Sequence, residues 1–178
     1  QRELSSEEYA AVIIEPIQGV GGIRMASTEF LQAAREACDK TGTLLIMDEV
    51  QSGYGRSGKF FAHQWAGVKA DIVSMAKGIA NGFPVGAIII SPKIPAKKGM
   101  LGTTFGGSHL ACAAAIAVAD VVKAENLVEN ARVMGEKIVE GIKGTSGIKE
   151  IRGSGLMIGV DLSVPQADFR RVLREKYH

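Results

Sequence analysis

The stretch "ADIVSMAKGIANGFPVGAIIIS", residues 70–91, joins two apolar runs through a lysine and a cluster of glycines. The first run, 72–75, is short and mostly apolar, which is typical of a buried strand. The second run, 87–90, follows closely, and the intervening glycines allow a sharp reversal. We therefore expect the two runs to pair as an antiparallel hairpin at the edge of a sheet. Lys77 would then lie just past the carboxyl end of the first strand, where the chain turns at the edge of the sheet.

Two earlier segments resemble the first of these runs. They are "AAVIIEP", residues 10–16, and "TLLIMDEV", residues 43–50. The segment between them, "STEFLQAAREACDKTG", places its apolar residues on one helical face, begins with a possible cap at Ser27 or Thr28, and ends at a glycine. Strand, helix and strand in this order predict a right-handed crossover and a parallel sheet, and hence an α/β fold.

The remaining chain predicts a second, smaller unit. A short helix is expected over 60–65, and residues 111–143 are alanine-rich with a helical period. The last part is typical of a strand, a turn, a strand and a helix. We therefore expect residues 1–110 to be part of a large domain, 111–143 to be a connecting helix, and 144–178 to be the start of a small α+β domain.

The amino-acid composition limits the classes of molecule that the protein is expected to bind. The 178 residues are 46% hydrophobic and 22% charged, the balance of a globular protein, and the net charge is only +2. Because the basic residues form no long run, we expect no nucleic-acid or membrane partner and favour small molecules. No apolar run reaches membrane-spanning length, and the first residues do not have the pattern of a signal peptide, so the expected location is the cytoplasm.

The cysteines predict neither a disulfide framework nor a metal site. Cys38 and Cys112 both fall in segments with a helical pattern, and two cysteines suit a reducing compartment. We expect both to be thiols of the core. Since no cysteine and histidine spacing matches a metal-binding motif, we expect no metal.

Three charged residues follow three successive predicted strands: Glu15, Asp48 and Lys77. In open α/β sheets, ligands bind outside the carboxyl ends of the parallel strands. Two acids and an amine beside glycine-rich loops therefore predict an active site at this edge. The alternative is that these three residues are ordinary charged side chains, exposed to solvent at the edge of the sheet.

A lysine and an aspartate at such an edge suit the chemistry of pyridoxal phosphate. A lysine amine beside apolar walls can lose its proton and attack an aldehyde to form an imine. A carboxylate opposite it can hold a proton on a heteroaromatic nitrogen. Pyridoxal phosphate needs both groups to act as an electron sink.

Four strings occur in this order along the chain: "IIEPIQGVGG", "LLIMDEVQSGYGRSGKFFA", "DIVSMAKGIANGFPVGA" and "TTFGGSHLACAAA". They resemble the class III (ornithine-type) aminotransferases, which are fold-type I pyridoxal-phosphate enzymes. A further string, "RGSGLMIGVDL", is most similar to the acetylornithine and succinylornithine aminotransferases. The resemblance covers nearly the whole chain and implies the second half of the large, mostly parallel-sheet domain plus the start of the small C-terminal domain.

The resemblance also implies a role for individual residues. Lys77 matches the lysine that forms the internal aldimine and moves the proton, and Asp48 matches the aspartate that pairs with the pyridine nitrogen. Val50 would lie against the ring, and Gln51 would hydrogen-bond its phenolic oxygen. Thr104 matches a threonine that reaches the cofactor phosphate of the neighbouring subunit, which implies a homodimer.

Other positions carry weaker implications. Glu15 matches a glutamate beside the substrate that can pair with a substrate-binding arginine. Val20 stands where the family usually has glutamate. We expect Arg56 to brace its loop rather than bind substrate, and we expect His63 and His109 to be structural or merely exposed.

The implied reaction is transamination of an N-acylated ornithine with 2-oxoglutarate, in arginine biosynthesis. The resemblance leaves ornithine, 4-aminobutyrate or another ω-amino donor open as alternatives. Members of this family carry a longer N-terminal half with a phosphate-binding cup and a C-terminal continuation with a carboxylate-binding arginine. Because neither is matched here, the chain is also interpreted as a catalytically incomplete fragment, inactive on its own.

Overall fold

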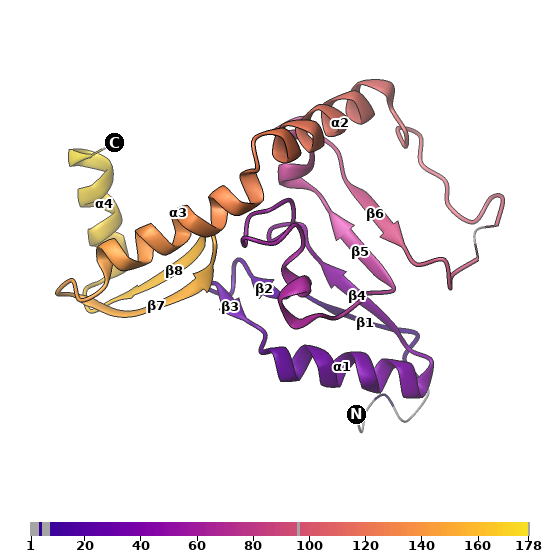
Figure 1. Cartoon of the computed structure of the whole chain (residues 1–178), viewed down its shortest axis with the longest axis horizontal. Coiled ribbons are helices and arrows are strands. Elements are labelled where there is room, and N and C mark those ends of the chain that lie inside the picture. The colour runs from indigo at the N-terminus through magenta and orange to yellow at the C-terminus, as the bar shows by residue number, and fades with distance from the viewer. Residues whose placement is uncertain (1–3, 5–7, 96, 178) are drawn as a thin grey trace.

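Four strands form the central sheet of the computed structural model, which describes Leu4, residues 8–95 and residues 97–177. The strands are β1 (Ala11–Ile14), β4 (Leu44–Asp48), β5 (Ile72–Met75) and β6 (Ala87–Ile90), in the spatial order β1-β4-β5-β6. β1, β4 and β5 run parallel, whereas β6 pairs antiparallel with β5 (Figure 1). The predicted parallel sheet and its antiparallel edge are both confirmed.

The register of the three parallel strands, β1, β4 and β5, brings their carboxyl ends to one edge of the sheet. Ile14 lies opposite Met47, and Asp48 lies opposite Ser74. The residues that follow the strands therefore emerge side by side at the same edge of the sheet.

The helix α1 (Thr28–Thr41) covers the strand β4. The Ser27 hydroxyl caps it by accepting a hydrogen bond of 3.1 Å from the Phe30 amide, and Gly42 ends it in the left-handed conformation with φ 70°. Leu31 and Cys38 of α1 are buried in one cluster with residues of β4. The predicted helix and both of its predicted ends are confirmed.

The remaining elements are short connections and the C-terminal unit. The loop after β1 contains a short antiparallel hairpin that the sequence analysis did not predict, in which β2 (Ile17–Gln18) pairs with β3 (Arg24–Met25). The short helix expected over 60–65 is the 3-10 helix η2 (Ala62–Ala66), and another, η3 (Lys77–Ala80), follows β5. β7 (Ile148–Ser154) and β8 (Met157–Leu162) form an antiparallel hairpin, and α4 (Gln166–Lys176) follows them, as predicted.

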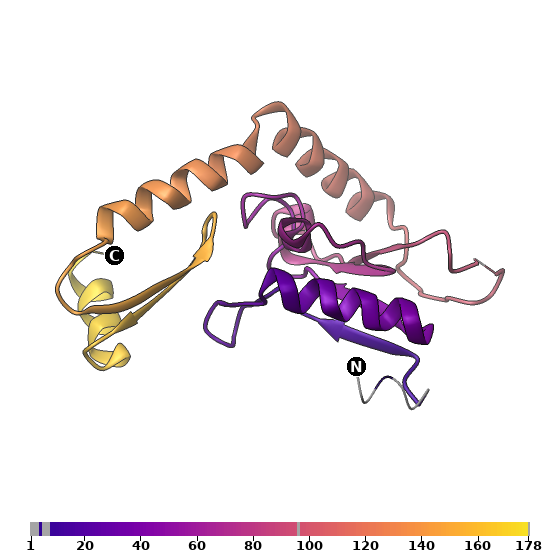
Figure 2. The same cartoon turned by 60° about the horizontal axis from the view of Figure 1, so that its bottom comes forward.

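The connecting helix expected over 111–143 is two helices, α2 (His109–Ala124) and α3 (Leu127–Ile142). Figure 2 shows them as the arms of an inverted V that links the four-stranded sheet with β7 and β8. The break falls at Asn126, whose φ of 51° is left-handed, a conformation that asparagine tolerates better than most residues. No helix formed by the described residues has the length and apolar character needed to cross a bilayer.

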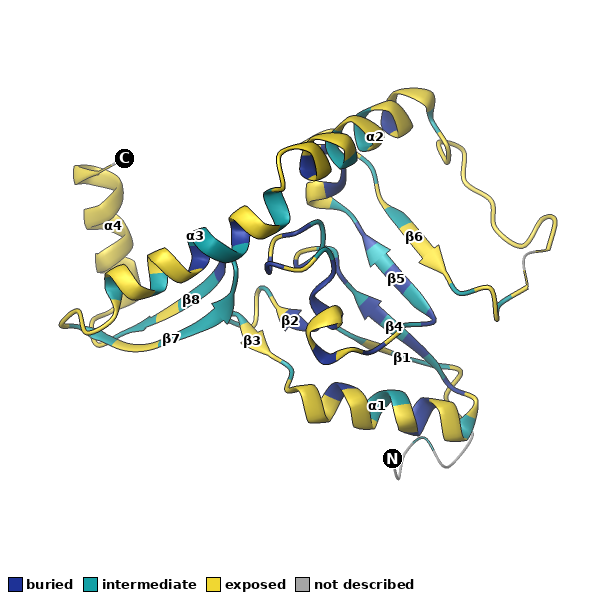
Figure 3. Cartoon of the chain, in the orientation of Figure 1, coloured by how far each residue is buried: buried dark blue, intermediate teal, exposed yellow. Residues whose placement is uncertain are grey.

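Large apolar side chains are exposed on β6 and α2, and Figure 3 shows α4 and the loop between β6 and α2 largely exposed. Ile88 and Ile89 of β6 are 50% and 49% exposed, and Leu110 of α2 is 71% exposed. Cys112, also on α2, is exposed, so the expectation that both thiols lie in the core is correct only for Cys38. The pattern of α2 is apolar around most of its circumference, so sequence alone could not say which side faces the protein.

A buried ion pair beneath the sheet leads to a first prediction. Asp71 accepts hydrogen bonds from Arg35 (2.7 Å) and from the Leu45 amide (2.8 Å), and its side chain is only 6% exposed. We expect Asp71→Ala to lower the free energy of unfolding by about 3 kcal/mol, because the half-buried guanidinium of Arg35 loses its buried carboxylate partner and the Leu45 amide loses its acceptor. Asp39→Ala is the control. It removes a 53%-exposed partner of the same arginine, so denaturant unfolding should detect a loss of less than about 1 kcal/mol.

The same pair sets the sign of a pH dependence. Burial would raise the pKa of Asp71, but the Leu45 amide and Arg35 outweigh it, and the pKa is lowered. The stabilisation is therefore complete above the unfolded-state pKa of about 4 and is lost as the pH falls through the lower folded-state value. An acid-unfolding profile of Asp71→Ala as steep as that of the wild type would contradict this.

Candidate active site

Asp48, the last residue of β4, is held through one of its two carboxylate oxygens. The Ser74 hydroxyl and the Val50 amide donate to Oδ1 at 3.1 and 3.0 Å. Within the described part of the chain, Oδ2 has no partner. The carboxylate is thus oriented, half-buried and able to receive one further donor. The sequence analysis did not identify Ser74 as a site residue, although a polar residue inside the apolar run of β5 is an indication of such a role.

The turn after Asp48 is fixed by a buried cluster. The Glu49 side chain is fully buried and accepts hydrogen bonds from the His63 amide (2.8 Å), His63 Nδ1 (2.8 Å) and the Ser52 hydroxyl (2.6 Å). His63 is itself buried and stacks on Phe61, with ring centroids 5.6 Å apart. These groups satisfy one another, so we assign the cluster a structural role, in agreement with the expectation for His63.

Lys77 begins η3 in a strained conformation. Its φ is 48°, in the left-handed region that non-glycine residues seldom adopt and that is often found at functional sites. Ile79 and Ala80 are buried and anchor the short helix, whereas the lysine itself is exposed. The unfavourable backbone conformation of Lys77 is thus maintained by its surroundings, and it places the lysine at the carboxyl edge of the sheet.

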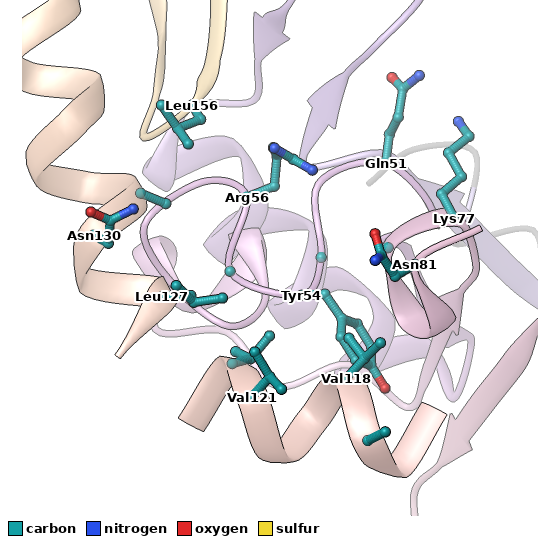
Figure 4. A pocket seen from close by; sticks show the side chains of 16 residues that line it. Gln51, Tyr54, Arg56, Lys77, Asn81, Val118, Val121, Leu127, Asn130 and Leu156 are labelled. Carbon is teal, nitrogen blue, oxygen red and sulfur yellow. The ribbon is translucent and has the colours of Figure 1, made fainter. Parts of the chain in front are cut away.

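The predicted site residues are divided between two adjoining regions. A cavity of about 590 Å³ is lined by Lys77 and Gln51, among others (Figure 4). A second, of about 480 Å³, is lined by Glu15 and Asp48. Val50 and Thr104 line neither. Val50 lies two residues after Asp48, whereas Thr104 is exposed on the loop before α2.

The loop from β2 to β3 bridges the two regions. The Gly19 amide donates to Glu15 Oε2 at 3.1 Å, so the Glu15 carboxylate folds this loop back on itself. The Gln51 side chain lies so close to Gly19 that a Cβ there would overlap the Gln51 amide group. Glycine at this position is therefore what allows Gln51 to lie in its present place.

Gly19→Ala tests this contact. Only the end of the flexible Gln51 side chain obstructs the new methyl group, and this side chain can move away. We therefore expect the free energy of unfolding to change by less than about 1 kcal/mol. Gln51 should be displaced. If Gln51 hydrogen-bonds the cofactor, as the resemblance implies, the affinity of the full-length protein for pyridoxal phosphate should fall by about tenfold, the usual value of one hydrogen bond to a charged or strongly polar group. Gln51→Ala is the matched variant. Unequal losses of cofactor affinity in the two proteins, measured by absorbance titration, would contradict the contact.

Arg56 braces its loop, as expected, because its backbone carbonyl accepts the Leu156 amide at 2.9 Å. Its side chain, however, is exposed and lines the larger cavity with Lys77. The sequence motif alone could not separate the role of the backbone from that of the guanidinium.

The described residues contain no group of three or more histidine, cysteine, aspartate or glutamate side chains that could hold a metal ion. At the strand edge, Lys77 offers an amine, and Asp48 offers a carboxylate oxygen without a partner among the described residues. An amine able to form an imine and a carboxylate able to hold a proton are the pair that pyridoxal phosphate requires.

Comparison with known proteins gives a consistent family. The model of the class-III aminotransferases matches residues 1–176. The acetylornithine aminotransferase of Methanosarcina mazei is 46% identical over 176 residues, which are 98% of this chain and 45% of that protein. The solved ornithine aminotransferase of Plasmodium yoelii superimposes with a TM-score of 0.88 at 32% identity, covering 98% of this chain and 49% of that one. An (S)-enantioselective ω-transaminase from Thermomicrobium roseum gives 0.82 at 36% identity, over 94% and 40% of the respective chains. The chain thus spans about half the length of the relatives it matches.

Proposed function

This chain belongs to the class-III aminotransferase family and has its fold-type I architecture, and from this we propose that the protein containing it transfers an amino group from an N-acylated ornithine to 2-oxoglutarate. The relatives named acetylornithine aminotransferase, 42% to 46% identical over most of the chain, support this choice. We propose that it serves arginine biosynthesis in the cytoplasm as a homodimer.

The geometry around Asp48 is the observation that best supports pyridoxal phosphate as the cofactor. Bound there, the cofactor supplies an electron sink for the carbanion left when a substrate C–H bond breaks. We assign Asp48 Oδ2, the oxygen without a partner, to the pyridine nitrogen, where it keeps the proton in place. Lys77 carries the covalent link and moves the substrate proton.

Four other residues complete the proposed site. Val50 lies against the ring face and Gln51 binds the phenolic oxygen. Thr104 serves the cofactor phosphate of the other subunit, and Glu15 lies beside the substrate and can pair with a substrate-binding arginine. We propose that residues 1–110 are part of the cofactor-binding large domain, that 111–143 connect the domains, and that 144–178 begin the small domain.

Ornithine is the strongest alternative donor, because solved ornithine aminotransferases superimpose closely on this chain. Other ω-amino donors, such as 4-aminobutyrate, use the lysine and aspartate in the same way. The test is to supply the full-length protein with each donor and 2-oxoglutarate and to follow glutamate formation. Turnover with ornithine but with neither acylated ornithine would replace the proposed donor.

A further alternative is that the 178-residue chain is catalytically incomplete on its own. Borohydride reduction after addition of pyridoxal phosphate, followed by peptide mass spectrometry, tests this directly. Selective pyridoxyl labelling of Lys77 in the isolated chain would show that its half of the site is already organised. Scattered labelling in the isolated chain, with selective labelling in the full-length protein, would show that the pocket needs the rest of the polypeptide.

A further inference from the structure

We propose that Arg56 binds a carboxylate group of the substrate. The proposal rests on the proposed function, because it concerns the substrates of the same site. It is carried by a guanidinium that has no partner among the described residues but belongs to a firmly fixed loop and lines the same cavity as Lys77.

The backbone around Arg56 is held from several directions. The Leu156 amide donates to the Arg56 carbonyl at 2.9 Å. The next carbonyl, that of Ser57, accepts the Ser154 hydroxyl at 2.8 Å and Trp65 Nε1 at 3.2 Å. These contacts come from the hairpin of β7 and β8 and from η2, so two separate parts of the chain position the loop.

Close packing fixes the loop further. A Cβ at Gly155 would overlap the backbone of residues 56–58. Tyr54, on the other side, has a left-handed φ of 57°, which a non-glycine residue adopts only when its surroundings impose it. A loop held in this way presents its side chain with little loss of backbone freedom on binding, which favours a recognition role.

The Arg56 side chain itself forms no such bond. Over the residues that the structure describes, its guanidinium makes no hydrogen bond and no ion pair, whereas Arg35, Arg132 and Arg152 each bind carboxylates. Figure 4 shows the guanidinium on the side of the loop that faces Gln51 and Lys77. Its planar set of donors matches a carboxylate through two parallel hydrogen bonds.

The rest of the cavity suits a carboxylate on a short carbon chain. Val118, Val121 and Leu127 line it below the polar groups in Figure 4, and Leu156 lines it as well. Apolar walls with a few polar groups at one end are typical of sites for small organic acids. Both the amino donor and 2-oxoglutarate carry such a carboxylate, so the experiment must separate the two sources.

The test uses the full-length protein with Arg56→Gln, Arg56→Lys and a control, Lys59→Gln. Lys59 lies in the same loop region, is exposed and stacks on Trp65 at 5.0 Å, so its replacement removes an equal charge without touching the cavity. Glutarate, a dicarboxylate that cannot react, is the probe. By calorimetry, Arg56→Gln should raise its Kd by about 10- to 100-fold, the value of a bidentate charged pair, Arg56→Lys should raise it less, and Lys59→Gln should leave it unchanged.

Steady-state kinetics identify the carboxylate. A rise in KM for 2-oxoglutarate alone assigns Arg56 to the acceptor, a rise for the amino donor alone assigns it to the donor, and a rise for both assigns it to both. Reaction of the bound cofactor with hydroxylamine, which has no carboxylate, should be unchanged in Arg56→Gln.

Two results would overturn the proposal. One is an unchanged Kd for glutarate with unchanged KM values in Arg56→Gln. The other is a weakened affinity for pyridoxal phosphate with unchanged glutarate binding, which would assign Arg56 to the cofactor phosphate. Failure of the proposed function is distinguishable, because absence of labelling at Lys77 in the wild type would refute that function, whereas glutarate binding by the unlabelled protein still tests Arg56.

Discussion

Replacing Lys77 by alanine in the full-length protein is expected to lower kcat/KM by about 10⁴-fold or more, because one side chain supplies both the covalent link to the cofactor and the proton transfer. Borohydride reduction should place no pyridoxyl group in the peptide that spans the position. Lys77→Arg keeps the positive charge but cannot form an imine, so it should be as inactive as the alanine variant.

Two matched variants separate the chemistry from the fold. Lys97→Ala removes a lysine from the exposed loop before α2 and should leave activity unchanged. Lys77→Gly should be inactive and yet more stable to denaturant by about 1 kcal/mol, because glycine adopts the left-handed φ of 48° without the penalty that a Cβ brings. Retention of more than one per cent of activity in Lys77→Ala would refute the assignment.

Asp48→Asn is expected to lower kcat/KM by about 10³-fold, the order found when one preorganised electrostatic contact of an active site is removed. The amide keeps an oxygen for the Ser74 hydroxyl and the Val50 amide but replaces Oδ2 by an NH₂ donor. It therefore preserves the shape of the site while losing the charge that holds a proton on the cofactor.

Ser74→Ala is the control for Asp48→Asn. It leaves the Asp48 charge and the Val50 hydrogen bond in place, so kcat/KM should fall only about tenfold, the value of one hydrogen bond to a charged group. Single-turnover rates of the half-reaction with glutamate are the measurement, because they isolate chemistry from product release. An Asp48→Asn protein within tenfold of the wild type would show that the carboxylate charge is not needed.

The sheet could be predicted from the sequence because each of its strands is a short apolar run with clear ends. Charged residues stand at the end of β4 and within two residues after β1 and β5, and Gly42 ends α1 with a φ of 70°. The break between α2 and α3 could not be predicted, because Glu125 and Asn126 are tolerated inside helices and only the packing of the two units decides the direction of the chain. The hairpin of β2 and β3 was missed because two-residue strands have no detectable period.

Site residues whose role follows from residue type and position at a strand end, such as Lys77 and Asp48, could be predicted. Site residues whose role depends on contacts between distant segments could not be predicted. Nothing in the sequence around Arg56 shows that its carbonyl accepts the amide of Leu156, 100 positions later, or that its guanidinium bonds to none of the residues that the structure describes. Gly19 and Gln51 lie together only because the loop after β1 folds back over the turn after β4.

The open edge of β6 has a consequence for handling the isolated chain. Natural sheets protect their edges with lysine, proline or a bulge, and β6, "AIII", contains none of these. Its outer backbone groups can add a strand from another molecule, and its half-exposed isoleucines would pack against that strand. Residues 1–178 in solution would then aggregate by addition of strands at the β6 edge. The time for which a preparation stays in solution would depend on protein concentration rather than on the unfolding equilibrium.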